Sequence, residues 1–166
     1  MRCRPKRITI LGIGNLLFRD EGLGVHVVER LKARYAFPDN VTVLDGGVLG
    51  LSLLGVISEA DHLIVIDAVK TGGKPGDLHR LQGDEVPRRF LAKTSLHQVD
   101  FAEALTAAQV LDRMPQIVVL GIEPLDIEGL GLTLTPGVQN RLEALIERVL
   151  KELGDLGASY REKRMV

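Results

Sequence analysis

Apolar positions along the chain follow two periodicities, and the first is typical of strands. Four short segments are almost continuously apolar, which predicts strands buried on both faces of a sheet. These segments are Arg7–Ile13, Val41–Leu44, His62–Ala68 and Gln116–Ile122. In Leu78–Leu81 apolar and polar residues alternate, which predicts that Lys74–Leu81 adds an antiparallel edge strand.

The second periodicity places apolar residues three or four positions apart and predicts helices. It covers Gly22–Ala36, Leu49–Ile57, Gln98–Leu111 and a last helix from Thr135 to Leu153. Thr135 is a favourable N-cap and Pro136 suits the first helical position, so the start of the last helix is well defined. Beyond Gly154 the chain is polar and charged, and we expect it to fray.

Strands that alternate with helices predict an α/β fold. We expect three αβα layers, in which a mostly parallel, twisted sheet of about five strands is flanked by helices. Lys70–Gly76 contains three glycines and a proline and is predicted to be a flexible loop. No repeat or linker divides the chain, so residues 1–166 are predicted to form a single domain with mobile termini at residues 1–6 and 155–166.

Composition narrows the function classes. Hydrophobic residues make up 45% of the chain but aromatic residues only 4%, so the core must consist of aliphatic side chains. A net charge of −1 gives no reason to expect nucleic acid or an anionic membrane as a partner. No segment reaches the roughly 20 apolar residues of a membrane helix. The basic start lacks a signal-peptide cleavage site, and the single Cys3 excludes an internal disulfide, so we expect a cytoplasmic protein.

Three residues with metal-binding side chains lie at predicted strand ends or in the loops that follow. Glu21 follows the first strand, Asp67 lies near the end of the third, and His97 precedes a helix. Ligands of open α/β sheets bind at the carboxyl ends of the strands. Two carboxylates and an imidazole suit a divalent transition metal with open coordination positions, and this set fits nickel or zinc.

Other interpretations of these motifs compete with a metal site. Gly12-Ile13-Gly14-Asn15 suggests a dinucleotide-binding loop, and Asp45 would then be placed to contact a ribose. However, Leu17 stands where the third glycine is needed, and Asp20 and Glu21 would repel a pyrophosphate. The glycines then serve tight turns and close backbone approach.

Every candidate except Asp67 also has a purely structural explanation, whereas an aspartate at the end of an apolar central strand would be costly to bury unless it is paired or ligated. Acidic residues at positions 20 and 21 favour a first helical turn, Asp45 suits a simple turn, and His97 alone suits a loop. The remaining histidines have no carboxylate context and are predicted to be structural or exposed: His26, His62 and His79. The metal interpretation therefore rests on Glu21, Asp67 and His97 occurring together.

With these motifs in view, the chain resembles the endopeptidases that mature nickel–iron hydrogenases, from Ile8 to about Leu153. The resemblance rests on an ordered set of motifs: Gly12–Asn15, Asp20–Gly24, Asp45–Gly47, Asp67–Ala68, Ser95–Gln98, Gly121–Pro124 and Leu134–Pro136. One departure is Val48, where a threonine often follows the aspartate-glycine-glycine element, so a hydroxyl-mediated contact is in doubt.

The resemblance implies a specific substrate, the precursor of the hydrogenase large subunit. Such enzymes remove its short C-terminal extension after nickel insertion, just beyond the last cysteine-containing nickel motif. By position, Glu21, Asp67 and His97 would contact nickel carried by the substrate. Asp45 would take part in substrate recognition or cleavage, and Glu21 and Asp45 are both candidates for the general base.

The residues leave the mechanism open between an aspartic-type and a metal-assisted reaction. No nucleophile elbow is present, and no helix carries two histidines four residues apart as in zinc proteases. A bound metal could polarise the scissile carbonyl or activate a water, and the loops Lys70–Gly76 and Asp126–Gly131 would frame the groove for the extension. A non-catalytic nickel-binding checkpoint or carrier, or a nucleotide-binding domain, stays as the alternative function.

Overall fold

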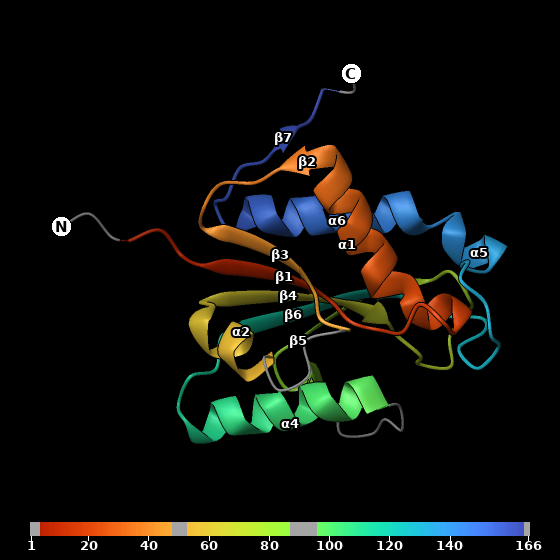
Figure 1. Cartoon of the computed structure of the whole chain (residues 1–166), viewed down its shortest axis with the longest axis horizontal. Coiled ribbons are helices and arrows are strands. Elements are labelled where there is room, and N and C mark those ends of the chain that lie inside the picture. Colours follow the sequence, from red (N-terminus) through yellow and green to blue (C-terminus); the bar gives the residue numbers. More distant parts are fainter. Residues whose placement is uncertain (1–3, 48–52, 87–95, 165–166) are drawn as a thin grey trace.

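A five-stranded sheet forms the centre of the molecule in the computed structural model, which describes residues 4–47, 53–86 and 96–164 (Figure 1). The spatial order of its strands is β3 (Val41–Asp45), β1 (Ile8–Gly12), β4 (His62–Ala68), β6 (Gln116–Ile122) and β5 (Leu78–Gln82). The first four are parallel, and β5 runs antiparallel to β6. The predicted αβα architecture with an antiparallel edge is therefore confirmed.

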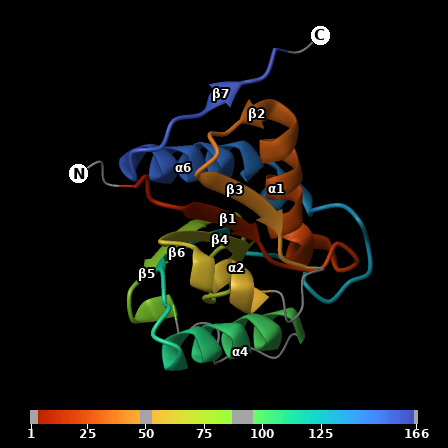
Figure 2. The same cartoon turned by 60° about the vertical axis from the view of Figure 1, so that its left-hand side comes forward.

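Helices cover both faces of this sheet. On one face lie α1 (Leu23–Arg34) and α6 (Leu142–Asp155), and on the other lie α2 (Leu53–Glu59) and α4 (Leu96–Val110) (Figures 1 and 2). A single 3-10 turn, η1 (Arg19–Gly22), precedes α1. The short helix α5 (Pro136–Gln139) precedes α6.

Strand β4 shows how the sheet divides the core into two layers. All seven of its residues are buried. Ile64 and Ile66 pack into the cluster with α1 and α6, whereas Leu63 and Val65 pack into the cluster with α2 and α4. Because side chains alternate between the faces of a strand, Asp67 projects to the side of α2 and α4.

The predicted last helix is interrupted in the structure. Thr135 is the N-cap of α5 and Pro136 the first helical residue, as expected, but α5 ends at Gln139 and α6 begins at Leu142. At the break, the Arg141 Nε–H donates to the Gly76 carbonyl at 3.2 Å, so a tertiary contact turns the chain between the two helices. The predicted apolar stripe is confirmed, since Val138 and the inward positions of α6 are buried.

Two further segments differ from the sequence prediction. Helix α1 ends at Arg34, and Tyr35–Ala36 forms strand β2, which pairs antiparallel with β7 (Arg161–Glu162). The chain after Gly154 was predicted to fray, yet its Tyr160 ring packs edge-on against Tyr35 with centroids 5.4 Å apart. Such long-range pairing leaves no periodic pattern in either segment.

Some predicted features lie outside the described residues. They are Cys3, Val48 and the start of the predicted helix Leu49–Ile57, of which the structure describes α2 from Leu53. The side chains of residues 96–99 also lie outside, so only the backbone position of His97 is given. Within the described ranges no helix is long and apolar enough to cross a membrane.

Candidate functional site

The topology of the sheet selects one ligand site. The chain passes from β1 to β3 on one side and then crosses to β4 on the other side of β1. Such a reversal opens a crevice between the carboxyl ends of the two central strands, here β1 and β4, where ligands of α/β proteins bind. Glu21 follows β1 and Asp67 lies near the end of β4, so both flank this crevice.

Glu21 is fixed in the turn after β1 and is only 8% exposed. Its N–H donates to the Phe18 carbonyl at 3.0 Å, and its own carbonyl accepts from the Asn15 N–H at 3.3 Å. Gly14 has φ +138°, and a Cβ there would lie 1.8 Å from the Glu21 carbonyl oxygen, so only glycine fits. The glycines after β1 thus serve a tight turn and close backbone approach, as one of the sequence interpretations proposed.

Asp67 lies inside the sheet, one residue beyond the pair formed by Gly12 and Ile66, and is 1% exposed. The first turn of helix α1 packs against the backbone at this end of the sheet. A Cβ on Gly24 would lie 2.3 Å from the carbonyl oxygens of Ile13 and Ile66, so the helix touches the backbone of both strands. A carboxylate buried this deeply is costly unless it has specific partners, which marks Asp67 as more than a packing residue.

His97 was predicted to precede a helix, but α4 already begins at Leu96, so His97 is its second residue. Its side chain lies outside the described part of the structure. Helix α4 begins at the same end of the sheet at which β1 and β4 finish, on the face toward which Asp67 projects (Figures 1 and 2). The backbone therefore brings the three predicted residues to one end of the sheet. Among the described side chains, to which that of His97 does not belong, no three from His, Cys, Asp or Glu are arranged to hold a metal.

Asp45 lies at the end of β3 and is half-buried. Its Oδ1 accepts from the Gly47 N–H at 2.8 Å, so the simple turn predicted for this motif is present. Asp45 is the register partner of Gly12, and β1 separates β3 from β4. Two strand spacings, about 10 Å, therefore separate the backbone of Asp45 from that of Asp67.

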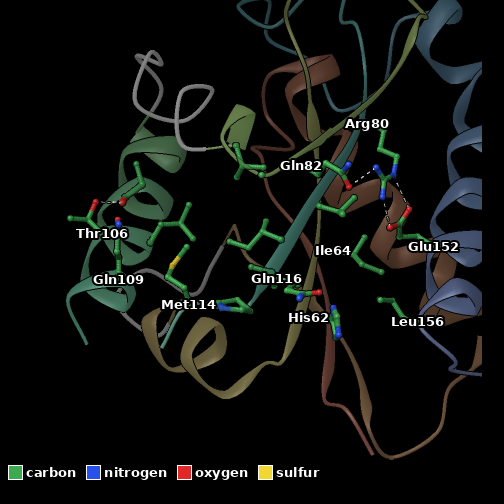
Figure 3. A pocket seen from close by; sticks show the side chains of 18 residues that line it. His62, Ile64, Arg80, Gln82, Thr106, Gln109, Met114, Gln116, Glu152 and Leu156 are labelled. Atoms are coloured by element: carbon green, nitrogen blue, oxygen red, sulfur yellow. Dashed lines mark hydrogen bonds and ion pairs between the residues drawn. The ribbon is translucent and has the colours of Figure 1, made fainter. Parts of the chain in front are cut away.

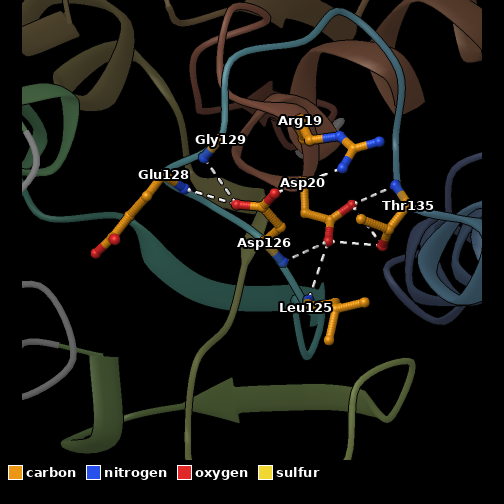
Figure 4. A network of polar contacts seen from close by, with 7 residues as sticks. All are labelled: Arg19, Asp20, Leu125, Asp126, Glu128, Gly129 and Thr135. Carbon is orange, nitrogen blue, oxygen red and sulfur yellow. Dashed lines mark hydrogen bonds and ion pairs between the residues drawn. The ribbon is translucent and has the colours of Figure 1, made fainter.

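Asp20 has a structural role that the sequence did not show (Figure 4). It is fully buried, and its Oδ1 accepts from the Thr135 N–H at 2.7 Å. Its Oδ2 accepts from the Leu125 and Asp126 N–H groups at 3.0 Å and from the Thr135 hydroxyl at 2.8 Å. Asp20 lies in a first helical turn, as predicted, but this turn belongs to the short helix η1 that precedes α1. Its carboxylate also joins the loop after β1 to the loop after β6.

Another buried carboxylate, Glu123, holds the glycine-rich loop that follows β4. It accepts from the Thr71 and Gly72 N–H groups, from the Thr71 hydroxyl at 2.8 Å, and pairs with the His79 Nε2 at 2.8 Å. Burial opposes ionisation, but these hydrogen bonds outweigh it and hold the pKa of Glu123 below its ordinary value. The prediction that His79 has no carboxylate context is therefore wrong, because Glu123, directly after β6, is 44 residues away in the sequence but adjacent in the fold.

A cavity of about 800 Å³ lies elsewhere in the molecule, between α4, the β5–β6 edge and the end of α6 (Figure 3). His62 and Gln116, the first residues of β4 and β6, line it. It therefore opens at the amino ends of the strands, the opposite end of the sheet from Glu21 and Asp67.

Comparisons with known sequences point to one family. The family model for hydrogenase maturation proteases, HycI, matches residues 25–152. The HupD hydrogenase expression/formation protein of Bradyrhizobium diazoefficiens is 48% identical over 158 residues, which cover 94% of this chain and 82% of that protein. The hydrogenase 2 maturation protease of Escherichia coli is 40% identical, over 91% of this chain and 93% of that protein.

Solved structures give the same result for the fold. The hydrogenase maturating endopeptidase HybD from E. coli superposes with a TM-score of 0.89 at 38% identity, over 95% of this chain and 98% of that one. A sequence match over most of the chain and a fold match over nearly all of it rule out a shared local motif as the explanation. The chain therefore belongs to the hydrogenase maturation protease family, whose members are endopeptidases and hence hydrolases.

Proposed function

We propose that this protein removes the C-terminal extension from the precursor of a nickel–iron hydrogenase large subunit, in the cytoplasm, after nickel has been inserted. The names of its relatives support a hydrogenase precursor as the substrate. The nickel is cargo of that precursor, and the protein recognises it through Glu21, Asp67 and His97.

The observation that carries this proposal is the pair of buried carboxylates at the crevice between β1 and β4. Glu21 and Asp67 are 8% and 1% exposed and come from the two central parallel strands or the turn directly after them. With the His97 imidazole they would offer three oxygen and nitrogen ligands, a set that suits nickel. The nickel would keep its remaining ligands from the precursor, so binding would report that the precursor is loaded.

The nickel can supply two kinds of chemistry to the cleavage. It can polarise the scissile carbonyl, or it can lower the pKa of a bound water to give a nucleophile. A carboxylate has to accept the proton in either case, and Asp45 and Glu21 are the candidates. Asp45 stands on the far side of β1 from Asp67, so it can approach the peptide while Glu21 and Asp67 contact the metal.

Cleavage of a nickel-loaded precursor tests the proposal. The precursor is prepared with and without nickel, incubated with the protein, and the loss of the extension is followed by mass spectrometry. We expect cleavage of the loaded form only, and none with Glu21→Gln or Asp67→Asn. Glu147→Gln, an exposed carboxylate on α6, is the matched control and should cleave like the wild type.

The same assay separates the alternative functions. If the loaded precursor binds and stays intact with the wild-type protein, the protein is a nickel checkpoint or carrier without a catalytic step. If nickel-free precursor is cleaved equally well, nickel recognition by this protein is refuted while the protease activity stands. Titration with NAD or ATP addresses the nucleotide alternative, and we expect no binding.

A further inference from the structure

Three leucines in the loops after β1 and β6 have side chains that are largely exposed to solvent. Leu17 is 57% exposed, Leu130 80% and Leu132 65%. Single exposed leucines are common on protein surfaces, but a contiguous apolar group is typical of an interaction site.

The backbone brings these three leucines together. Phe18 and Gly131 form an isolated parallel bridge, in which the Gly131 N–H donates to the Leu17 carbonyl and the Arg19 N–H donates to the Gly131 carbonyl, both at 2.9 Å. Neighbours of a bridged pair project to the side opposite the pair. Leu17, Leu130 and Leu132 therefore lie on one side of this two-segment unit, while Phe18 and Gly131 are half-buried on the other.

The buried Asp20 fixes this apolar surface in place (Figure 4). Its carboxylate binds Leu125, Asp126 and Thr135 across the two loops, and its own N–H donates to the Asp126 carbonyl at 3.0 Å. The Asp126 carboxylate is itself held, since its Oδ1 accepts from the Gly129 N–H at 2.8 Å. Polar groups at the centre of the two loops are thus satisfied internally, and the apolar side chains are left on the outside.

The same surface is tied directly to the candidate site. The Leu17 N–H donates to the Asn15 Oδ1 at 2.9 Å, and the Asn15 N–H donates to the Glu21 carbonyl. Phe18, the residue after Leu17, accepts from the Glu21 N–H. A partner whose metal reaches Glu21 therefore comes close to Leu17 with the surface around that metal.

We propose that Leu17, Leu130 and Leu132 form an apolar docking surface for the folded body of the hydrogenase precursor, next to its nickel site. This inference rests on the proposed function and adds to it the surface by which the precursor is held. The occupant is the folded body because the nickel that Glu21 contacts in the proposed function belongs to that body, and Leu17 lies in the same turn as Glu21, four residues before it. Burial of such leucines would contribute to binding in the ground state and the transition state alike.

The double variant Leu130→Ser/Leu132→Ser tests this surface, with Leu17→Ser as a second variant. Leu111→Ser is the matched control, because Leu111 is as exposed as Leu17 (57%) but follows the end of α4 at the opposite end of the sheet. With nickel-loaded precursor, we expect the double variant to raise KM about tenfold or more and to leave kcat unchanged, as for a loss of uniform binding. Leu111→Ser should have the wild-type KM.

A competition experiment identifies the part of the precursor that is bound. Nickel-loaded large subunit that already lacks the extension should inhibit wild-type cleavage, and should inhibit the double variant about tenfold less well. Competition by a synthetic extension peptide alone, with none by the shortened subunit, would refute the folded body as the occupant. A wild-type dimer that the double variant dissociates, at unchanged KM, would assign the surface to a second copy of this chain.

The two proposals fail in different ways. If the wild-type protein does not cleave the loaded precursor at all, the proposed function fails. If it does cleave, and the double variant matches it in KM and kcat, only the docking surface is refuted. A fall in kcat at unchanged KM would also contradict the proposal, because it would place these leucines in the chemical step.

Discussion

Replacement of Asp20 by asparagine is the most informative single change to the site's framework. Both carboxylate oxygens accept hydrogen bonds: Oδ1 from the Thr135 N–H, and Oδ2 from the Leu125 and Asp126 N–H groups and the Thr135 hydroxyl. Asparagine keeps the shape but has one acceptor oxygen and one donor NH2 group. In either orientation of the amide, at least one buried backbone N–H would face another donor.

The expected loss of stability follows from the less costly of the two orientations of the asparagine amide. With the NH2 group in the Oδ1 position, only the Thr135 N–H loses its acceptor, which costs about 1–3 kcal/mol for a buried donor. The other bonds change from charged to neutral acceptors and weaken by roughly half. Because a neutral amide is also cheaper to bury than a carboxylate, we expect a net loss of about 2–4 kcal/mol in the free energy of unfolding.

Urea denaturation of wild type, Asp20→Asn and a control measures this loss. The control is Asp155→Asn, whose ion pair with Lys151 is largely exposed, and it should change the free energy of unfolding by less than about 0.5 kcal/mol. If Asp20→Asn also costs less than that, the two loops do not depend on this carboxylate. The leucine surface would then not be held in place by Asp20.

Three further predictions concern the rest of the fold. The pKa of Glu123 is lowered in the folded state, so its ionised form contributes to the free energy of unfolding. This contribution is complete above about pH 4.3 and is lost as the pH falls through the lower pKa of the folded state. In Glu123→Gln, the free energy of unfolding measured by denaturant titration should therefore fall less steeply at acid pH. Gly24→Ala should lower the free energy of unfolding by about 2 kcal/mol or more in thermal denaturation, because its Cβ would meet two carbonyl oxygens. Gly55→Ala in α2, with open space around it, should raise the free energy of unfolding by up to about 1 kcal/mol. Leu145→Ala on the buried face of α6 should cost about 2–5 kcal/mol by urea denaturation, and a loss below 1 would contradict the packing of that helix.

The sequence was sufficient for the elements that carry a strong periodic signal. The buried strands His62–Ala68 and Gln116–Ile122 have the predicted bounds, because an uninterrupted apolar run has little freedom in where it ends. The antiparallel edge Leu78–Gln82 followed from alternation alone. The turn between Gln139 and Leu142 and the pairing of β2 with β7 did not follow, since each depends on contacts with distant segments.

In the candidate site, too, some features were predictable from the sequence and others were not. The placement of Glu21 and Asp67 at the carboxyl ends of strands was predictable because each lies at or after the end of an apolar segment, and the strand order then placed both at one crevice. The roles of Asp20 and Glu123 were not, because their partners are separated from them in sequence by up to 115 residues for Asp20 and 52 for Glu123. A buried carboxylate that holds a loop has the same residue type as one that binds a metal, so only the three-dimensional contacts distinguish the two.

The nickel X-ray absorption spectrum of the loaded precursor tests the central claim most directly. It would be recorded alone and after addition of the Asp45→Asn variant, chosen to slow cleavage while the crevice between β1 and β4 stays intact. We expect added oxygen and nitrogen ligands at the nickel on binding, and their loss when Glu21→Gln and Asp67→Asn are introduced as well. The contradicting result is an unchanged spectrum although the precursor is bound and the wild-type protein cleaves it. These residues would then not contact the substrate's nickel.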